Sequence, residues 1–313
     1  MTILSAFDIG LVVLILGIGA STIAAREAVT AVIGFVVYGL LLSIAWVRLS
    51  AMDVALTEAA IGGGMTGVLM LGAVARLRLV KDNDIGTSLP VRFATAVLCA
   101  LVAAGLAIAI LSPPDAIPTL APMVMANLAQ SGLGNPVAGV LFVYRALDTL
   151  LEKVVLLLAL LGIWSLAPDN MWGGIPGLRV YARANSTLTV LAQLLPPVGI
   201  VVAIYMCWVG ANEPGGAFQG GTILAAMWLL VMIAGLKRIP SISQPRLRLL
   251  LVVGPAIFLA IGLAGMVLAD AFLAYPAGYA KPLIVAIEVA LTLSIGAALG
   301  LLAAGPPERV QQP

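Results

Sequence analysis

Histidine is absent from the 313-residue sequence, and charged residues make up only 10% of it. Without histidine, the chain cannot build a histidine metal site, a histidine-ligated haem, a Ser-His-Asp triad or a histidine proton relay. Soluble domains carry about 25% charged residues, so this chain has too few to cover a surface in water. The 62% hydrophobic content excludes a disordered chain, and the net charge of +2 excludes a basic nucleic-acid binder. A polytopic membrane protein remains.

Cysteine and early basic residues are also scarce. Cys99 and Cys207 both lie in apolar runs, where a buried or lipid-facing thiol is favoured over a disulfide or a metal ligand. The first basic residue is Arg26, so the N-terminus lacks the basic region of a signal peptide. We therefore expect the first apolar run to remain as a membrane span, and we expect no metal site and no cofactor.

Nine apolar runs are long enough to cross a bilayer. A spanning helix needs about 20 apolar residues and satisfies its own backbone groups, which excludes an open sheet, and continuous runs do not fit a barrel. The expected fold class is therefore all-α, a polytopic integral membrane protein with about nine transmembrane helices. The expected spans are residues 5–25, 28–47, 52–74, 93–111, 137–166, 187–209, 218–236, 247–269 and 282–304.

The basic residues predict the orientation of the chain, because cytoplasmic loops carry an excess of lysine and arginine. Most of the 16 basic residues fall on one side of the nine spans: Arg26, Arg76, Arg78, Lys81, Arg92, Arg179, Arg183, Lys237, Arg238, Arg246, Arg248 and Arg309. This bias predicts an N-terminus outside and a C-terminus in the cytoplasm. The loops divide the chain into three parts, residues 1–92, 93–183 and 184–313.

Seven ionisable residues of the expected spans are candidates for a functional site, because a charge costs about 2.5–3.5 kcal/mol at the bilayer centre. They are Asp53, Glu58, Arg145, Asp148, Glu152, Lys153 and Glu288. If all were ionised, three acids would be in surplus. These acids must be protonated, paired with another subunit or neutralised by a bound cation, and each case favours an ion or proton path. The alternative is a set of salt bridges that only fixes helix packing.

Four of these charges lie on the span at residues 137–166. At about 100° per residue, Arg145, Asp148 and Glu152 fall within an arc of about 60°, with Lys153 further round the helix. Arg145 can bridge Asp148, whereas Asp148 and Glu152 repel each other, so one of them is expected to hold a proton. The pattern predicts a proton relay, and a role in packing is the alternative.

Two glycine-rich segments interrupt the apolar pattern. Gly62, Gly63 and Gly64 stand in mid-span, where they permit a π-bulge or kink, or close helix packing. A second segment opens the seventh span with irregular backbone, which either lines an ion path or forms a tight outer turn docked on its neighbours. The residues expected to form this turn are Asn212, Pro214, Gly215, Gly216, Phe218, Gly220 and Gly221.

Three segments resemble subunits of the Mrp-type multisubunit sodium/proton antiporters. Residues 53–60, DVALTEAA, are similar to a stretch near the C-terminal end of the large A subunit, and residues 144–152, YRALDTLLE, to its later FRGFDTLGE stretch. Residues 212–221, NEPGGAFQGG, resemble the PGGGFQGG signature of the B subunit. The order is that of an A-subunit tail followed by a B subunit. The departures, at Ala146, Leu147, Leu151 and Ala217, leave the charged positions unchanged.

The resemblance implies a non-enzymatic membrane subunit of a Na+/H+ antiporter complex in a bacterial or archaeal cytoplasmic membrane. The three parts would be a three-helix A-like segment, a two-helix segment with the charged helix, and a four-helix B-like domain. The implied partners are the bilayer, other membrane subunits and the ions Na+ and H+, with no nucleic acid. Because the same modules occur in membrane arms of energy-converting hydrogenases and complex I, a respiratory ion-translocating subunit is the alternative. A structural spacer is a third interpretation.

Overall fold

Helices make up the regular structure in the computed structural model, which describes residues 5–77, 88–112, 119–178 and 187–307. Among these residues there is no strand, and only an isolated bridge joins Pro176 to Pro307. The basic residues Arg78, Lys81, Arg179, Arg183 and Arg309, which contribute to the expected orientation, lie outside the described residues. The all-α fold expected from the sequence is therefore confirmed.

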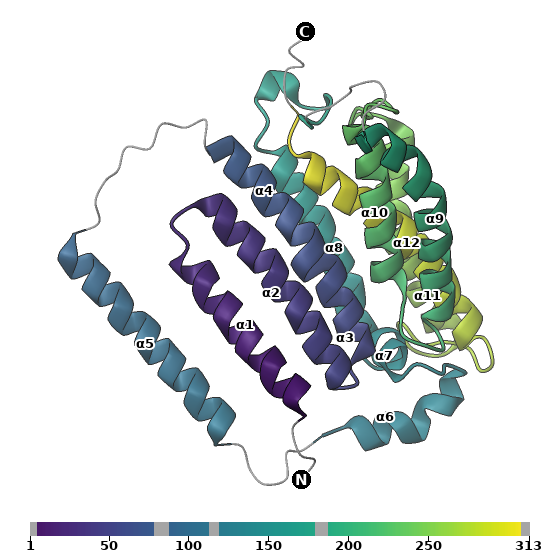
Figure 1. Cartoon of the computed structure of the whole chain (residues 1–313). Coiled ribbons are helices and arrows are strands. Elements are labelled where there is room, and N and C mark those ends of the chain that lie inside the picture. Colours follow the sequence, from purple (N-terminus) through teal and green to yellow (C-terminus); the bar gives the residue numbers. More distant parts are fainter. Residues whose placement is uncertain (1–4, 78–87, 113–118, 179–186, 308–313) are drawn as a thin grey trace.

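The N-terminal part consists of three spans that lie side by side (Figure 1). Helix α1 (Ala6–Ala24) starts at Ser5, whose side chain and that of Asp8 cap each other's backbone amides. Helix α2 (Ala28–Arg48) returns along it, and Arg48 pairs with Asp8 at 2.7 Å. The third span changes geometry along its length, as α3 (Met52–Thr57), the π-helix η1 (Glu58–Met65) and α4 (Thr66–Leu77).

Helix α5 (Leu89–Leu111) stands apart from the other helices in Figure 1 and has no buried residue. It begins four residues before the expected start at residue 93. Pro90 explains the difference, because proline fits the first turn of a helix, where its missing amide costs nothing.

The middle of the chain departs most from the expected span at residues 137–166. A short helix α6 (Ala121–Asn127) and a 3-10 turn η2 (Leu128–Ser131) occupy the loop before it. The span itself is α7 (Pro136–Gly139), the π-helix η3 (Val140–Tyr144) and α8 (Ala146–Trp164), with non-helical backbone at Arg145. From the sequence, one continuous helix was expected here. A 3-10 turn η4 (Asp169–Met171) follows.

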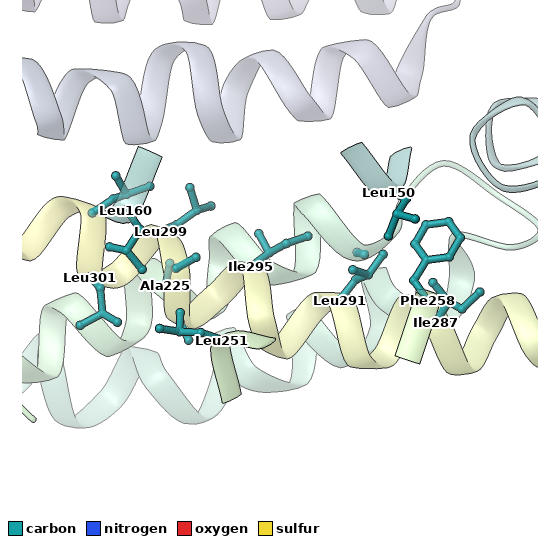
Figure 2. Close-up of a cluster of buried hydrophobic side chains, with 14 of the residues drawn as sticks. Leu150, Leu160, Ala225, Leu251, Phe258, Ile287, Leu291, Ile295, Leu299 and Leu301 are labelled. Atoms are coloured by element: carbon teal, nitrogen blue, oxygen red, sulfur yellow. The ribbon is translucent and has the colours of Figure 1, made fainter. Parts of the chain in front are cut away.

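The C-terminal part packs around α12, the most buried of the candidate spans. Its helices are α9 (Thr187–Val209), α10 (Ala217–Ile233), α11 (Pro245–Leu268) and α12 (Ala280–Ala304). Figure 2 shows five labelled side chains of α12, among them Ile287 and Leu291, against residues of α8, α10 and α11. Gly296 and Gly300 on α12 lie against α10, which allows these two helices to approach closely.

Seven helices of the described residues are long and apolar enough to cross a membrane. Two further expected spans differ from these. Helix α10 has 17 residues and is apolar but shorter, and the 19-residue α8 carries Asp148, Glu152 and Lys153. The multi-pass character is therefore confirmed, and the total of nine spans stays a prediction.

Candidate functional site: a charged cavity between three parts of the chain

A cavity of about 220 Å³ opens where the third span, α8 and the C-terminal helices meet. Four of the seven charged candidates line it, namely Asp53, Glu152, Lys153 and Glu288. The glycine-rich turn also contributes Gly215, Gly216 and Phe218. Residues that lie up to 235 positions apart in the sequence therefore share one space. The sequence alone places these charges on separate helices and does not show which of those helices adjoin.

Asp53 connects the N-terminal part to the glycine-rich turn. Its Oδ1 accepts a hydrogen bond from the Gly215 amide at 3.0 Å. Gly215 and Gly216 have φ angles of +156° and +123°, which side chains rarely allow, and the Gly216 amide donates to Met206 O at 2.8 Å. The turn is thus docked against α9 and also lines the cavity, while its role in an ion path stays a prediction.

Asn135 fixes the same contact from the middle of the chain. Its Oδ1 accepts from the Val137 amide at 2.9 Å and caps α7, so its Nδ2 points the other way. This Nδ2 lies 3.4 Å from Asp53 Oδ2 and donates to the carbonyl oxygens of Gly210 and Glu213 at 3.2 and 3.1 Å. Asn135 was not among the candidates from the sequence, although an asparagine directly before a proline is a typical helix N-cap signal.

Gln219 and Thr57 form a second connection across the cavity. Gln219 Nε2 donates to Thr57 Oγ1 at 3.1 Å, and the Thr57 hydroxyl donates to Asp53 O at 2.8 Å. Because the hydroxyl proton goes to Asp53, Thr57 Oγ1 must accept from the Gln219 amide, which defines the orientation of that amide. Neither residue was among the candidates from the sequence, since their contact depends on the packing of α10 against α3.

Lys153 is a buried cation at the wall of the cavity, with only 3% of its side chain exposed. Its Nζ lies 3.3 Å from the centroid of the Phe218 ring and 3.7 Å from Glu152 Oε2. The cation–π interaction of a desolvated ammonium with an aromatic face contributes about 2 kcal/mol or more. The Phe218 ring thus stabilises the buried ammonium of Lys153 on α8. Glu152, its other neighbour, is half exposed.

Glu288 is the most buried acid among the described residues, at 2% exposure. Its Oε2 has no hydrogen-bond partner in the part of the chain that the structure describes. Its Oε1 lies beside Gly216, 3.2 Å from the position that a Cβ would take there. Lys281, two turns earlier on the same face of α12, donates to Asn212 Oδ1 at 2.7 Å.

Arg145 and Asp148 do not reach this cavity. They pair with each other and line a separate, more open pocket beside Phe272 and Leu273. Arg145 is the non-helical residue that precedes α8, and Asp148 lies about one helical turn closer to that end of the helix than Glu152 does. The expected relay of Arg145, Asp148 and Glu152 on one face is therefore divided between two locations.

The π-helix before Arg145 leaves backbone carbonyls that other groups satisfy. Thr149 Oγ1 donates to Leu141 O at 2.6 Å, and Tyr275 Oη donates to Phe142 O at 3.0 Å. Burial raises the pKa of Tyr275, so its hydroxyl keeps its proton and remains a donor. The break is thus held by specific side chains, as an irregular backbone inside a membrane requires.

Glu58 and the glycines of the third span lie away from the cavity. A π-helix spans Glu58–Met65 and includes Gly62, Gly63 and Gly64. The Glu58 carboxylate lies between Gly62 and Gly39 of α2, and Gly63 packs against the backbone of α2 near Val36. The structure therefore has both the π geometry and the close packing that the sequence leaves open as alternatives.

No group of three histidine, cysteine, aspartate or glutamate side chains that could hold a metal ion occurs among the described residues. The cavity is instead lined by three carboxylates, two side-chain amides and two hydroxyls, next to an ammonium. Such a set can bind, exchange or repel a small monovalent cation or a proton.

Comparisons with known proteins match two segments of the chain to family models. Residues 187–304 match the family model of a domain related to the MnhB subunit of Na+/H+ antiporter. We call residues 187–304 the MnhB-related domain. Residues 2–79 match the MbhD family model, which describes the D subunit of MBH. The two matches confirm an Mrp-type A/B-like arrangement, in which the MnhB-related domain comes last.

Individual relatives cover different shares of the chain. A putative antiporter subunit mnhA2 of Staphylococcus aureus is 29% identical over 162 residues, which are 51% of this chain and 20% of that protein. The chain thus spans about a fifth of the length of this curated relative. A chain in the structure of the Mrp complex from Dietzia sp. DQ12-45-1b matches 100% of this chain over 36% of its own length, with 25% identity and a TM-score of 0.73.

A second solved structure has the same fold over part of the chain. It is the membrane-bound sulfane sulfur reductase (MBS), an archaeal respiratory membrane complex. The match covers 67% of this chain and 95% of the other, with 21% identity and a TM-score of 0.55. At this identity the likeness concerns the fold alone.

Proposed function

We propose that this chain is a membrane subunit of a multisubunit monovalent cation/proton antiporter complex, which exchanges Na+ for H+. The observation that carries the proposal is the cavity at the junction of the N-terminal part and the MnhB-related domain, where Asp53, Glu152, Lys153 and Glu288 meet. Charged side chains inside a membrane are costly and typically mark ion paths. The remaining candidates, Glu58, Arg145 and Asp148, would act at the ends of this path or at contacts with other subunits.

The partners in this proposal are other membrane subunits of the same complex. Several apolar faces support this, because the described helices α5 and α1 expose nearly all of their large side chains. We further propose that the complex lies in a bacterial or archaeal cytoplasmic membrane and that the chain itself is not an enzyme. Residues 1–92, 93–183 and 184–313 would be its three parts.

The purified complex tests this function directly. We expect that a complex isolated through a tag on this chain and reconstituted into vesicles moves protons when a Na+ gradient is applied, as followed with a pH-sensitive dye. A K+ gradient of the same size serves as the comparison. Absence of any cation-driven proton movement in the intact complex would contradict the proposal.

A respiratory role is a second candidate, favoured by the match of residues 2–79 to the MbhD family model. In that case the co-purified subunits would include proteins with iron–sulfur clusters, and the visible absorbance of the complex would show them. A colourless complex composed of membrane subunits favours the antiporter. The composition of the purified complex therefore distinguishes the two functions.

We also propose nine spans, with the N-terminus outside and the C-terminus in the cytoplasm. Figure 1 supports this, because α1 begins at one end of the bundle and α12 ends at the other. The Gly177 amide donates to Pro306 O at 3.0 Å, so the loop after α8 lies on the same side as the end of α12. The basic residues Lys237, Arg238, Arg246 and Arg248 lie between α10 and α11 or at the start of α11.

Cysteine labelling tests this orientation. In a variant with Cys99→Ser and Cys207→Ala, we expect Gln244→Cys to react with an impermeant maleimide only in everted vesicles. We expect Gln130→Cys to react only in whole cells, because the basic loops face the cytoplasm. Both positions are exposed, so a lack of access would reflect the membrane and not burial. Labelling with the opposite sidedness would reverse the orientation of every span.

A further inference from the structure

Glu288 has an unused carboxylate oxygen inside the protein. It lies within α12 at 2% exposure, and its Oε2 has no hydrogen-bond partner among the described residues. An ionised carboxylate that is taken out of water costs several kcal/mol unless another group compensates it. Asp53 lines the same cavity, so two ionised carboxylates there would repel each other and increase this cost. Glu288 therefore needs either a proton or a cation.

The oxygen atoms around Glu288 leave room for such a cation. The position of a Cβ on Gly216 would be 3.2 Å from Glu288 Oε1 and 3.6 Å from Gln219 Oε1. Both oxygens thus lie beside Gly216, and any residue with a Cβ at this position would fill the space next to them. The amide of Gln219 is oriented by its bond to Thr57, so that its Nε2 faces Thr57 and its Oε1 is directed to Gly216.

The charges around the cavity favour a single positive ion. Its charged groups are Asp53 on α3, Glu152 and Lys153 on α8 and Glu288 on α12, three acids and one base. Lys153 is held over Phe218 and beside Glu152, which leaves Asp53 and Glu288 without an ammonium partner. A volume of about 220 Å³ can hold an ion together with several waters, since a water occupies about 30 Å³.

We propose that Glu288 and Gln219, on either side of Gly216, bind a monovalent metal cation, Na+, with Asp53 and Thr57 nearby. Hard cations prefer such carboxylate, amide and hydroxyl oxygens. When Na+ leaves, one proton binds the Glu288 carboxylate in its place, so the site holds one monovalent cation in either state and its net charge does not change. The inference rests on the proposed function, because it names the residues at which the two ions compete.

Glu288→Gln tests the site, because glutamine keeps the size of the side chain and removes its charge. We expect the assembled complex to require at least about tenfold more Na+ for half-maximal proton movement. We also expect the thermal stabilisation of the purified complex by added Na+ to disappear, which is measured without transport. The matched control is Glu213→Gln, an exposed acid of the same turn, which should behave as the unaltered complex.

Two further variants keep the test informative if Glu288→Gln fails to assemble. Gln219→Met removes the amide oxygen at nearly the same length, and Gly216→Ala places a methyl group between the two oxygens; both should raise the Na+ requirement. Gly278→Ala is the control for the second change, because Gly278 also has a positive φ of +79° but has no atom within 4 Å of its Cβ position.

The outcomes separate the site from the function. An unchanged Na+ requirement and unchanged Na+ stabilisation in Glu288→Gln at normal abundance would overturn the site. The site would also be overturned if lower pH, but not added Na+, raised the thermal stability of the unaltered complex. Loss of Na+ stabilisation in Glu288→Gln would support the site even if the unaltered complex showed no Na+-driven proton movement. In that case only the proposed antiport would be contradicted.

Discussion

Replacing Lys153 with methionine is expected to abolish Na+-driven proton movement while the complex remains assembled. Methionine has a similar length and an apolar stem, so it keeps the packing against Phe218 in a position that is 3% exposed. What it removes is the one positive charge among three acids at the cavity. Losing a preorganised charge in a buried site typically lowers rates by about a hundredfold or more.

The measurement is dye-detected proton movement in vesicles, with the abundance of the complex determined in the same samples. Lys237→Met is the control, because Lys237 is exposed in the loop after α10. Lys153→Arg should retain part of the activity, since it keeps the charge but enlarges the head group. Normal transport by Lys153→Met at normal abundance would show that this lysine only fills space.

Gly221→Val is expected to prevent the folded chain from accumulating. A Cβ on Gly221 would lie 2.8 Å from Ile295 Cγ2 and 3.1 Å from the carbonyl oxygen of Thr292, both on α12. The carbonyl belongs to the helix backbone and cannot rotate away as a side chain can. Overpacking a tight contact costs about 1–3 kcal/mol for small additions, and valine adds three carbons at the seam between α10 and α12.

The experiment measures the amount of chain in the membrane and its thermal stability in mild detergent. Gly162→Val provides the control, because Gly162 also lies within a helix but has nothing within 4 Å of its Cβ position. It should change stability by only a few tenths of a kcal/mol, set by helix propensity. Equal accumulation of both variants would mean that α10 and α12 are not in contact as closely as the structure has them.

The spans could be located well from the sequence because their hydrophobicity depends only on neighbouring residues. The expected span at 187–209 coincides with α9, and that at 282–304 starts two residues after α12 does. The glycine-rich turn was also recognisable, since glycines at positive φ are a local requirement. Local features of this kind are readable from a single sequence.

The site was only partly readable because it depends on tertiary contacts. Arg145 was expected on one helix face with Asp148 and Glu152, but a π-helix ends just before it and its own backbone is not helical. No glycine or proline within Val140–Tyr144 signals this break. Asn135 and Gln219 carry no charge, so their importance becomes visible only where they bond to partners 75 to 162 residues away.

The contact between Asp53 and the Gly215 amide joins residues 162 positions apart in one polypeptide. Were the N-terminal part and the MnhB-related domain separate proteins, this bond would lie at an interface that dilution could dissociate. A continuous chain fixes their ratio at one to one and replaces a concentration-dependent encounter with an intramolecular one. The two halves of the cavity are then synthesised together, and neither can be lost from the membrane without the other.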